Sequence, residues 1–261
     1  MNEWREARRG GREKILNLPT VVTAVLGALL LVQLAMSALP FSMVEALYAE
    51  LAFTPARISS AFWPEAAARV MAPALRADVD PAELVRALGA EPVPWWSFVT
   101  YALLHASWTH LTVNGVTLAA FGSPLARRIG PARFLVFLAL TAVAGAAAHF
   151  AVHPFDLAPV VGASAAISGT MAASARFAFA RFRAEGEPSA SPQGASLSEL
   201  WRNRQALTFV GLWFGVNLLF GLFPRATGET ELIAWEAHVG GFVAGLLLFG
   251  LLDPRGAKRA I

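Results

Sequence analysis

Ser164 and His238 are residues of the types that nucleophilic catalysis requires. Ser164 lies in the sequence Gly-Ala-Ser-Ala, which starts at Gly162, and His238 lies in Ala-His-Val-Gly-Gly. A serine hydroxyl is a weak nucleophile until a neighbouring base accepts its proton, and imidazole is a common base. The two side chains could therefore form a catalytic dyad if the fold brings them together. The alternatives are that the small residues around Ser164 only allow close helix packing, and that His238 only bonds a neighbouring helix.

His110 and Asn114 could supply hydrogen-bond donors to the same reaction. They are four residues apart, so both side chains project from one face of a helix. The carbonyl oxygen of a substrate peptide becomes an oxyanion in the tetrahedral intermediate, and such donors stabilise it. The backbone amide of Ser164 could join them, because the first amides of a helix lack intrahelical acceptors. A polar clamp between two helices is the structural alternative for this pair.

The other three histidines fit metal binding less well than a structural role. The sequence contains no His-Glu-x-x-His pattern, which is the usual helical zinc signature. His105 precedes His110 by five residues and should point away from the face that His110 occupies. His149 and His153 are expected at the outer end of a helix, as structural residues rather than ligands. We therefore predict that catalysis uses neither a metal nor a cofactor.

An acidic partner for His238 is not evident in the sequence. Glu236 is two residues before His238 and should point in a different direction from the same helix. Asp156 and Asp253 lie near the ends of predicted segments. A dyad is therefore a simpler prediction than a triad.

The elements that hold these residues are predicted to be membrane helices. Of the 261 residues, 56% are hydrophobic and 15% are charged, and the mean hydropathy is +0.52. One soluble core does not need so much apolar side chain, so the bilayer is the natural solvent. The absence of cysteine excludes disulfides and thiolate metal sites. Six segments have the roughly 20 apolar residues that crossing a bilayer requires, namely 19–41, 97–121, 132–152, 158–180, 206–223 and 232–252.

The distribution of basic residues predicts on which side of the membrane the two ends lie. Most of the 21 Lys and Arg residues lie in the terminal tails and in the second-to-third and fourth-to-fifth loops. The positive-inside rule places these parts in the cytoplasm. We therefore predict cytoplasmic tails at 1–18 and 253–261 around a six-span membrane domain at 19–252. The basic residues are not interleaved with aromatic ones in a stripe, which argues against nucleic acid as a partner.

Two segments outside the predicted spans carry further signals. The loop at 42–95 mixes apolar, aromatic and charged residues, so it is predicted to lie on or partly in the outer membrane interface. The start and stop signals of a helix occur within this loop, at Asp80, Pro81, Glu83 and Gly89. The segment 184–199 is rich in Ser, Pro, Gly, Ala and Glu and is predicted to be a flexible cytoplasmic linker.

Together, these motifs and their order along the spans resemble the rhomboid family of intramembrane serine proteases. The second span carries His-x-x-x-x-His-x-x-x-Asn, the fourth carries Gly-x-Ser, and the sixth carries Ala-His-x-Gly-Gly. The resemblance implies an all-α, six-transmembrane-helix bundle with a water-filled cavity open to the outer face. It also implies Ser164 as the nucleophile and His238 as the base, with an oxyanion site formed by His110, Asn114 and the backbone amide of Ser164.

The same resemblance implies the substrates and the location of the protein. Such enzymes cleave single-span membrane proteins near the outer surface, where helix-breaking residues must first free a carbonyl group for attack. A bacterial inner (plasma) membrane is the expected location. Three positions depart from the family pattern: Ala165 stands for a glycine, Ser97 for an arginine and Ser168 for an aromatic residue. The competing hypotheses are a non-catalytic relative that binds or escorts membrane clients and, more remotely, a small transporter.

Overall fold

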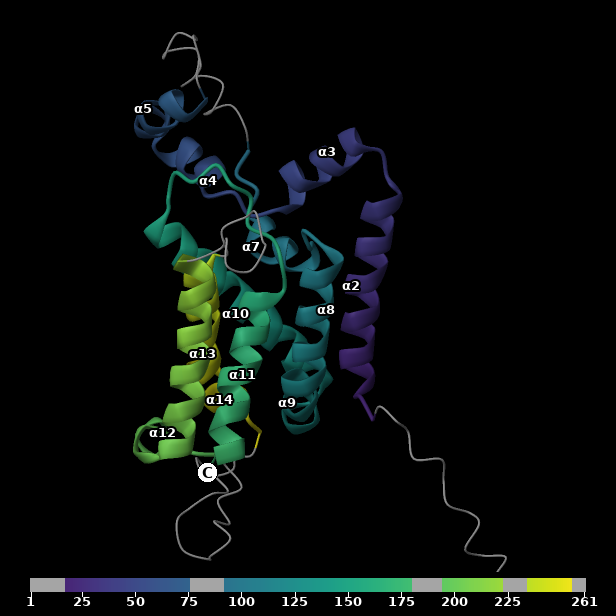
Figure 1. Ribbon diagram of the computed structural model, residues 1–261, viewed down its shortest axis with the longest axis vertical. Helices are drawn as coiled ribbons and strands as arrows, with labels where there is room; N and C mark the ends of the chain where they lie inside the picture. Colours follow the sequence, from purple (N-terminus) through teal and green to yellow (C-terminus); the bar gives the residue numbers. More distant parts are fainter. Residues whose placement is uncertain (1–16, 76–91, 180–193, 223–233, 255–261) are drawn as a thin grey trace, which may run out of the picture.

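The computed structural model describes residues 17–75, 92–179, 194–222 and 234–254, which are mostly helical (Figure 1). Among these residues the only extended pairing is one isolated antiparallel bridge between Phe53 and Val160. The helices, with η1 a short 3-10 helix and η2 a π-helix, are α2 (Thr20–Ala38), α3 (Phe41–Leu51), α4 (Pro55–Phe62), α5 (Pro64–Leu75), α7 (Ser97–Thr100), η1 (Tyr101–Leu103), α8 (Trp108–Thr117), η2 (Leu118–Gly122), α9 (Ser123–Ile129), α10 (Pro131–Val152), α11 (Ser164–Ala178), α12 (Leu197–Arg202), α13 (Arg204–Leu222) and α14 (Trp235–Leu252).

Three helices of the described ranges are long and apolar enough to cross a membrane, namely α2, α10 and α14. The 19 residues of α2 span about 28 Å at ~1.5 Å per residue, close to the thickness of the hydrocarbon core. These helices occupy the first, third and sixth predicted segments, and α13 occupies the fifth. The prediction of an all-α membrane protein is confirmed, whereas the number of spans stays a prediction.

The second predicted span is shifted along the chain. Residues 97–107 form α7, η1 and a loop, and α8 starts only after them. Ser107 sets this start, because its hydroxyl accepts a hydrogen bond from the His110 amide at 3.1 Å and caps the helix. The helix continues through η2 into α9 and ends before Gly130, whose φ is 84°. The predicted span 97–121 was therefore wrong at both ends.

The fourth predicted span starts at Ser164 rather than at 158. Val160 and Phe53 exchange two backbone hydrogen bonds, of 2.8 and 3.1 Å, and the chain is extended there. Gly162 then adopts a φ of 115°, a left-handed conformation that a residue with a side chain rarely takes. The chain cannot be helical through these residues, so α11 begins two positions after Gly162.

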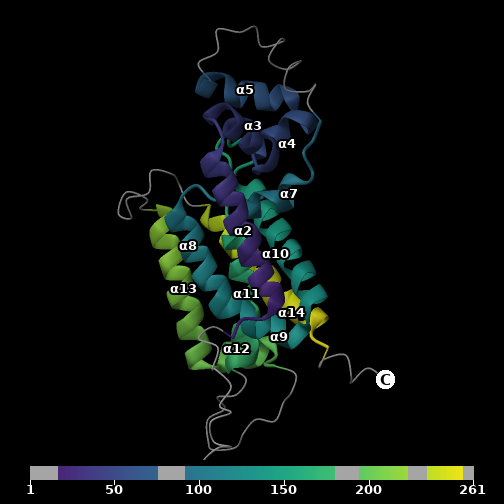
Figure 2. The same ribbon diagram turned by 90° about the vertical axis from the view of Figure 1, so that its right-hand side faces the viewer.

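Glycine residues let α11 and α14 pack backbone against backbone near the centre of the molecule (Figure 2). A methyl group added to Gly241 would overlap the backbone of Ala165, and one added to Gly245 would overlap the backbone of Gly169. Small residues allow this close approach between membrane helices, which is then stabilised by van der Waals contact. The spacing of Gly241 and Gly245 along one face of α14 is what the sequence indicated.

Helices α3, α4 and α5 lie together at one end of the bundle (Figure 1). Three exposed aromatic residues gather there: the ring of Phe62 lies 5.9 Å from those of Trp63 and Trp95, and all three residues are more than half exposed. Tryptophan and tyrosine side chains concentrate at membrane interfaces because they have an apolar body and a polar edge. The interfacial position of this loop stays a prediction, and the helix signals at 80–89 lie outside the described residues.

The prediction of a flexible linker at 184–199 is wrong for its last residues. Its part at 184–193 lies outside the described residues, but Ala195 is buried and its carbonyl accepts a hydrogen bond from Arg176 at 3.0 Å. Ser196 and Glu199 form a reciprocal capping box that starts α12. The Ser and Glu that suggested a flexible segment therefore serve, in this part, to begin a helix.

Candidate active site

Ser164 and His238 are in contact although 74 residues separate them in the sequence. The Nε2 atom of His238 lies 2.7 Å from the Oγ atom of Ser164, which is a normal hydrogen-bond distance. Ser164 is the first residue of α11, and His238 lies in the first turn of α14. The glycine contacts between these two helices bring the turns together, so the structure provides the proximity that a proton transfer between the two side chains needs.

The loop before Ser164 is fixed by backbone hydrogen bonds. The amide of Gly162 donates to the carbonyl of Tyr101 at 3.0 Å. Tyr101 is itself buried, and its hydroxyl donates to the carbonyl of Ala142 in α10 at 2.9 Å. Ser164 therefore follows a loop whose backbone is fixed by hydrogen bonds. Its own backbone amide belongs to the first turn of a helix, where amides lack intrahelical acceptors.

His110 and Asn114 lie against this turn from the side of α8. A methyl group added to Gly162 would lie 2.7 Å from the Nε2 atom of His110 and 3.5 Å from the Nδ2 atom of Asn114. Both side chains therefore approach the backbone just before Ser164. The Nδ2 atom of Asn114 is buried and has no hydrogen-bond partner among the described residues. Leaving such a buried donor unpaired costs about 1–3 kcal/mol of stability. The Nδ2 atom can therefore donate a hydrogen bond to a ligand oxygen.

His105 lies closer to His110 than the sequence suggested. The two rings are 5.0 Å apart and meet edge to face, because the residues between η1 and α8 are not helical and the helical spacing rule does not apply to them. His105 is buried, and its carbonyl accepts a hydrogen bond from the hydroxyl of Tyr48 in α3 at 3.3 Å. Its predicted structural role in fixing the loop is consistent with these contacts.

Asn217 of α13 is a site residue that the sequence did not reveal. Its Oδ1 atom lies 2.5 Å from the Nδ1 atom of His238, on the ring edge opposite Ser164. Its Nδ2 atom donates to the Trp213 carbonyl at 2.8 Å, which fixes which end of the amide faces the imidazole. The one amide side chain in a largely apolar predicted span was the available signal, since polar groups at membrane depth usually have a function.

The structure shows what surrounds the three residues that depart from the family pattern. The methyl group of Ala165 faces Gly145 of α10, where an added methyl group would lie only 2.5 Å away. Gly145 therefore provides the space that the additional methyl beside the serine occupies. Ser168 is buried one turn after Ser164. Ser97 is also buried, and its hydroxyl has no partner among the described residues.

Glu236 does not contact the candidate dyad through its carboxylate. It faces His149 and His153 at the end of α10, as its position two residues before His238 indicated. The expected position of His149 and His153 at a helix end agrees with the structure, because α10 ends at Val152.

Comparisons with known proteins all relate this chain to one protein family. The family model of the Rhomboid domain matches residues 92–254. YdcA of Bacillus subtilis (strain 168), which carries a provisional rhomboid protease name, is 39% identical over 82 residues, 31% of this chain and 41% of YdcA. The rhomboid protease GluP of the same organism is 34% identical over 79 residues, 30% of this chain and 15% of GluP. The alignments span less than half of either relative. Since the domain match covers more than half of the sequence, this chain belongs to the rhomboid family.

Proposed function

We propose that this protein is an intramembrane serine endopeptidase that cleaves transmembrane segments of membrane proteins near the outer membrane face. The observation that carries the proposal is the 2.7 Å contact between the Ser164 hydroxyl and the His238 imidazole. The protease names of the two relatives support the same activity. A hydroxyl next to a properly oriented imidazole is the minimum that acyl transfer through serine requires.

In this mechanism, Ser164 Oγ attacks the carbonyl carbon of the scissile bond while its proton passes to Nε2 of His238. The tetrahedral intermediate then collapses, His238 donates the proton to the leaving amine nitrogen, and the acyl group stays on Ser164 as an ester. A water molecule, losing a proton to His238, attacks this ester to form a second tetrahedral intermediate. When this intermediate collapses, His238 returns the proton to Ser164 Oγ and the second product is released. Each step is a proton transfer or an addition to a carbonyl, so the scheme uses no cofactor.

Asn217 orients the base in this scheme. Because its Nδ2 atom donates to a backbone carbonyl, its Oδ1 atom faces His238 and can only accept a hydrogen bond. The proton of the neutral imidazole is therefore on Nδ1, which leaves the lone pair of Nε2 directed at the Ser164 hydroxyl. The neutral asparagine takes the place that a carboxylate has in a serine protease triad.

The oxyanion is stabilised by His110, Asn114 and the backbone amide of Ser164. All three groups border the turn at Gly162, next to the attacking oxygen. Asn114 gives the strongest support, since its buried Nδ2 donor has no partner among the described residues and can bond to an oxyanion that forms beside it. Such donors are typically worth about 2.7–4 kcal/mol of transition-state stabilisation.

The membrane arrangement that accompanies this function is the one the sequence predicts. Six spans within 19–252 place the tails at 1–18 and 253–261 in the cytoplasm and the loop at 42–95 at the outer interface of a bacterial inner membrane. The described helices give each predicted span a helical counterpart. Substrates are single-span membrane proteins that reach the dyad from the bilayer.

Covalent labelling by a fluorophosphonate probe tests the function directly. The probe phosphorus should bond to Ser164 Oγ with loss of fluoride, so the parent protein in detergent micelles should become fluorescent and Ser164→Ala should not. Ser168→Ala, which removes a hydroxyl one turn away, should label like the parent. A folded parent that stays unlabelled would favour the competing role, binding or escorting membrane clients without cleaving them.

Two asparagine variants should slow cleavage in different ways. Asn114→Ala should lower kcat by about 100- to 1,000-fold at every pH, because it removes only a transition-state contact.

Asn217→Leu should also lower kcat but, in addition, shift the midpoint of the pH–rate profile, because the base loses its hydrogen-bond partner. Asn217→Asp, which keeps an acceptor oxygen, should retain more activity than Asn217→Leu. Equal activity of the parent and Asn217→Leu would remove Asn217 from the mechanism.

A further inference from the structure

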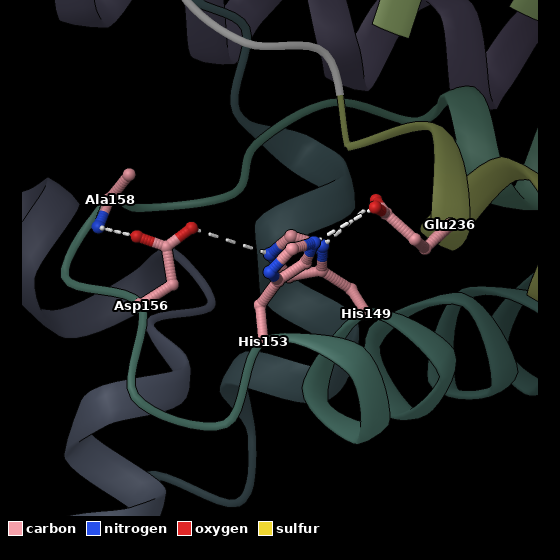
Figure 3. Close-up of polar contacts among 5 residues, drawn as sticks. All are labelled: His149, His153, Asp156, Ala158 and Glu236. Carbon is pink, nitrogen blue, oxygen red and sulfur yellow. Dashed lines mark hydrogen bonds and ion pairs between the residues drawn. The ribbon is translucent and has the colours of Figure 1, made fainter. Parts of the chain in front are cut away.

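A second cluster of functional side chains lies beside the candidate active site and takes no part in the proposed reaction. His149 and His153, four residues apart at the end of α10, meet Glu236 from the first turn of α14 (Figure 3). The Oε1 atom of Glu236 is 2.9 Å from Nε2 of His153, and its Oε2 atom is 3.4 Å from Nδ1 of His149. One potential metal-binding atom from each residue lies within 4.8 Å of the other two.

The cluster contains a buried polar atom without a partner. His149 is only 5% exposed, and its Nε2 atom makes no hydrogen bond with any described residue. The Oδ2 atom of Asp156 is 3.9 Å away from it, beyond hydrogen-bond distance. Asp156 is held there because its Oδ1 atom accepts a hydrogen bond from the Ala158 amide at 3.0 Å. Hydrogen bonds from the two imidazoles to Glu236 thus do not account for every polar atom of the cluster.

We propose that His149, His153 and Glu236 bind a divalent transition-metal ion, with Zn²⁺ as the best match. Two imidazole nitrogens and one carboxylate oxygen are a common ligand set of this ion, whereas Mg²⁺ and Ca²⁺ prefer oxygen ligands alone. Tetrahedral Zn²⁺ with bonds of about 2.0–2.1 Å places neighbouring ligand atoms about 3.3 Å apart. The carboxylate of Glu236 already lies near this distance from both imidazoles, with Oε1 2.9 Å from Nε2 of His153 and Oε2 3.4 Å from Nδ1 of His149.

Asp156 supports the metal from outside its ligand shell. Figure 3 shows the two imidazole rings between Glu236 on one side and Asp156 on the other. When His149 binds the metal through Nδ1, its Nε2 atom carries the proton and points to the Asp156 carboxylate. A carboxylate in this position typically orients a metal-bound imidazole and raises its basicity. The side chain of His153 is 45% exposed, which gives an ion and a fourth, water ligand access from the surface.

The ion would connect the end of α10 to the turn of α14 that carries His238. Glu236 is two residues from His238, and the two side chains leave that turn in different directions, one to the metal and one to Ser164. Metal binding should therefore stabilise the folded protein without occupying the candidate dyad. Binding can be measured on the catalytically inactive Ser164→Ala variant, so its outcome is independent of whether the protein is a protease.

Cobalt and zinc titrations of the untagged, chelator-treated protein in detergent test this site. Co²⁺ should give the visible absorption of a tetrahedral complex with one ion per chain, and Zn²⁺ should displace it and raise Tm. His153→Ala should lower the affinity at least about tenfold, and Asp156→Asn should lower it about 10- to 100-fold. His238→Ala, which removes a histidine from the adjacent site, should bind like the parent.

Three results would overturn the metal site. The first is a parent protein that binds no Co²⁺ or Zn²⁺. The second is binding that His153→Ala and Glu236→Gln leave unchanged, and the third is an equal loss of affinity in His238→Ala. Because His153 is half-exposed, its replacement by alanine should leave the protein folded, which its melting transition without metal would verify.

Discussion

Ser164→Ala should abolish cleavage of a single-span membrane reporter, with a loss of about 10⁶-fold in kcat, the size of the loss when a serine protease loses its nucleophile. The variant lacks the oxygen that attacks the carbonyl, and no other hydroxyl is in contact with His238 in the described part of the chain. The measurement is the initial rate at which a fluorescent reporter is cut in proteoliposomes containing parent or variant protein at equal concentration.

The His238→Ala variant and the double variant, which combines it with Ser164→Ala, test whether the two residues act as one unit. Residues that act as one unit lose activity together, so the double variant should be no slower than either single variant. Ser168→Ala is the matched control, because it removes a buried hydroxyl from the same helix one turn away, and its rate should stay within a few-fold of the parent's. Unimpaired cleavage by Ser164→Ala would exclude the nucleophile that we propose.

Gly241→Ala should lower both the stability and the rate of cleavage, through the distance between two helices. The added methyl group would overlap the carbonyl oxygen of Ala165, which is backbone and cannot rotate away. Helix α14 must then move away from α11, which carries Ser164. Overpacking of this kind typically costs about 1–3 kcal/mol of stability, and a displacement of about 1 Å in a catalytic group can lower the rate about 100-fold. Reporter cleavage and thermal unfolding in detergent would measure both effects.

Gly215→Ala is the matched control for this substitution. Gly215 lies in α13, and an added methyl group there would have no neighbouring atom within 4 Å. It should therefore leave both the rate and the unfolding temperature close to those of the parent, although it adds the same group to a similar apolar helix. If Gly241→Ala behaved like Gly215→Ala, the backbone contact between α11 and α14 would not control the distance between Ser164 and His238.

The helical structure, and which residues of the candidate site share a helix face, could be predicted from sequence because both depend on spacing along one helix. Gly241 and Gly245 share a face with His238, and the contact of that face with α11 brings the imidazole to Ser164. His110 and Asn114 share a face in the same way. Their roles in catalysis stay proposals, but their proximity follows from the periodicity of a helix and the small size of glycine.

The helix boundaries near the site could not be predicted, because they depend on interactions that hydropathy does not include. The start of α8 is set by the hydroxyl of Ser107, and the start of α11 by the left-handed turn at Gly162. For this reason the ring of His105 lies next to that of His110 instead of pointing away from it. Asn217 was missed because its partner, His238, is on another helix and no local pattern connects the two residues.

The turn at Gly162 also arranges the candidate active site before a substrate binds. Its left-handed backbone, its bond to Tyr101 and its contact with His110 are all present in the free protein. In the reaction that we propose, the entropy of arranging the donors is therefore lost once, during folding, and not again in each catalytic cycle. Such preorganisation lets an enzyme stabilise a transition state without rearranging its own dipoles, and here one residue without a side chain makes it possible.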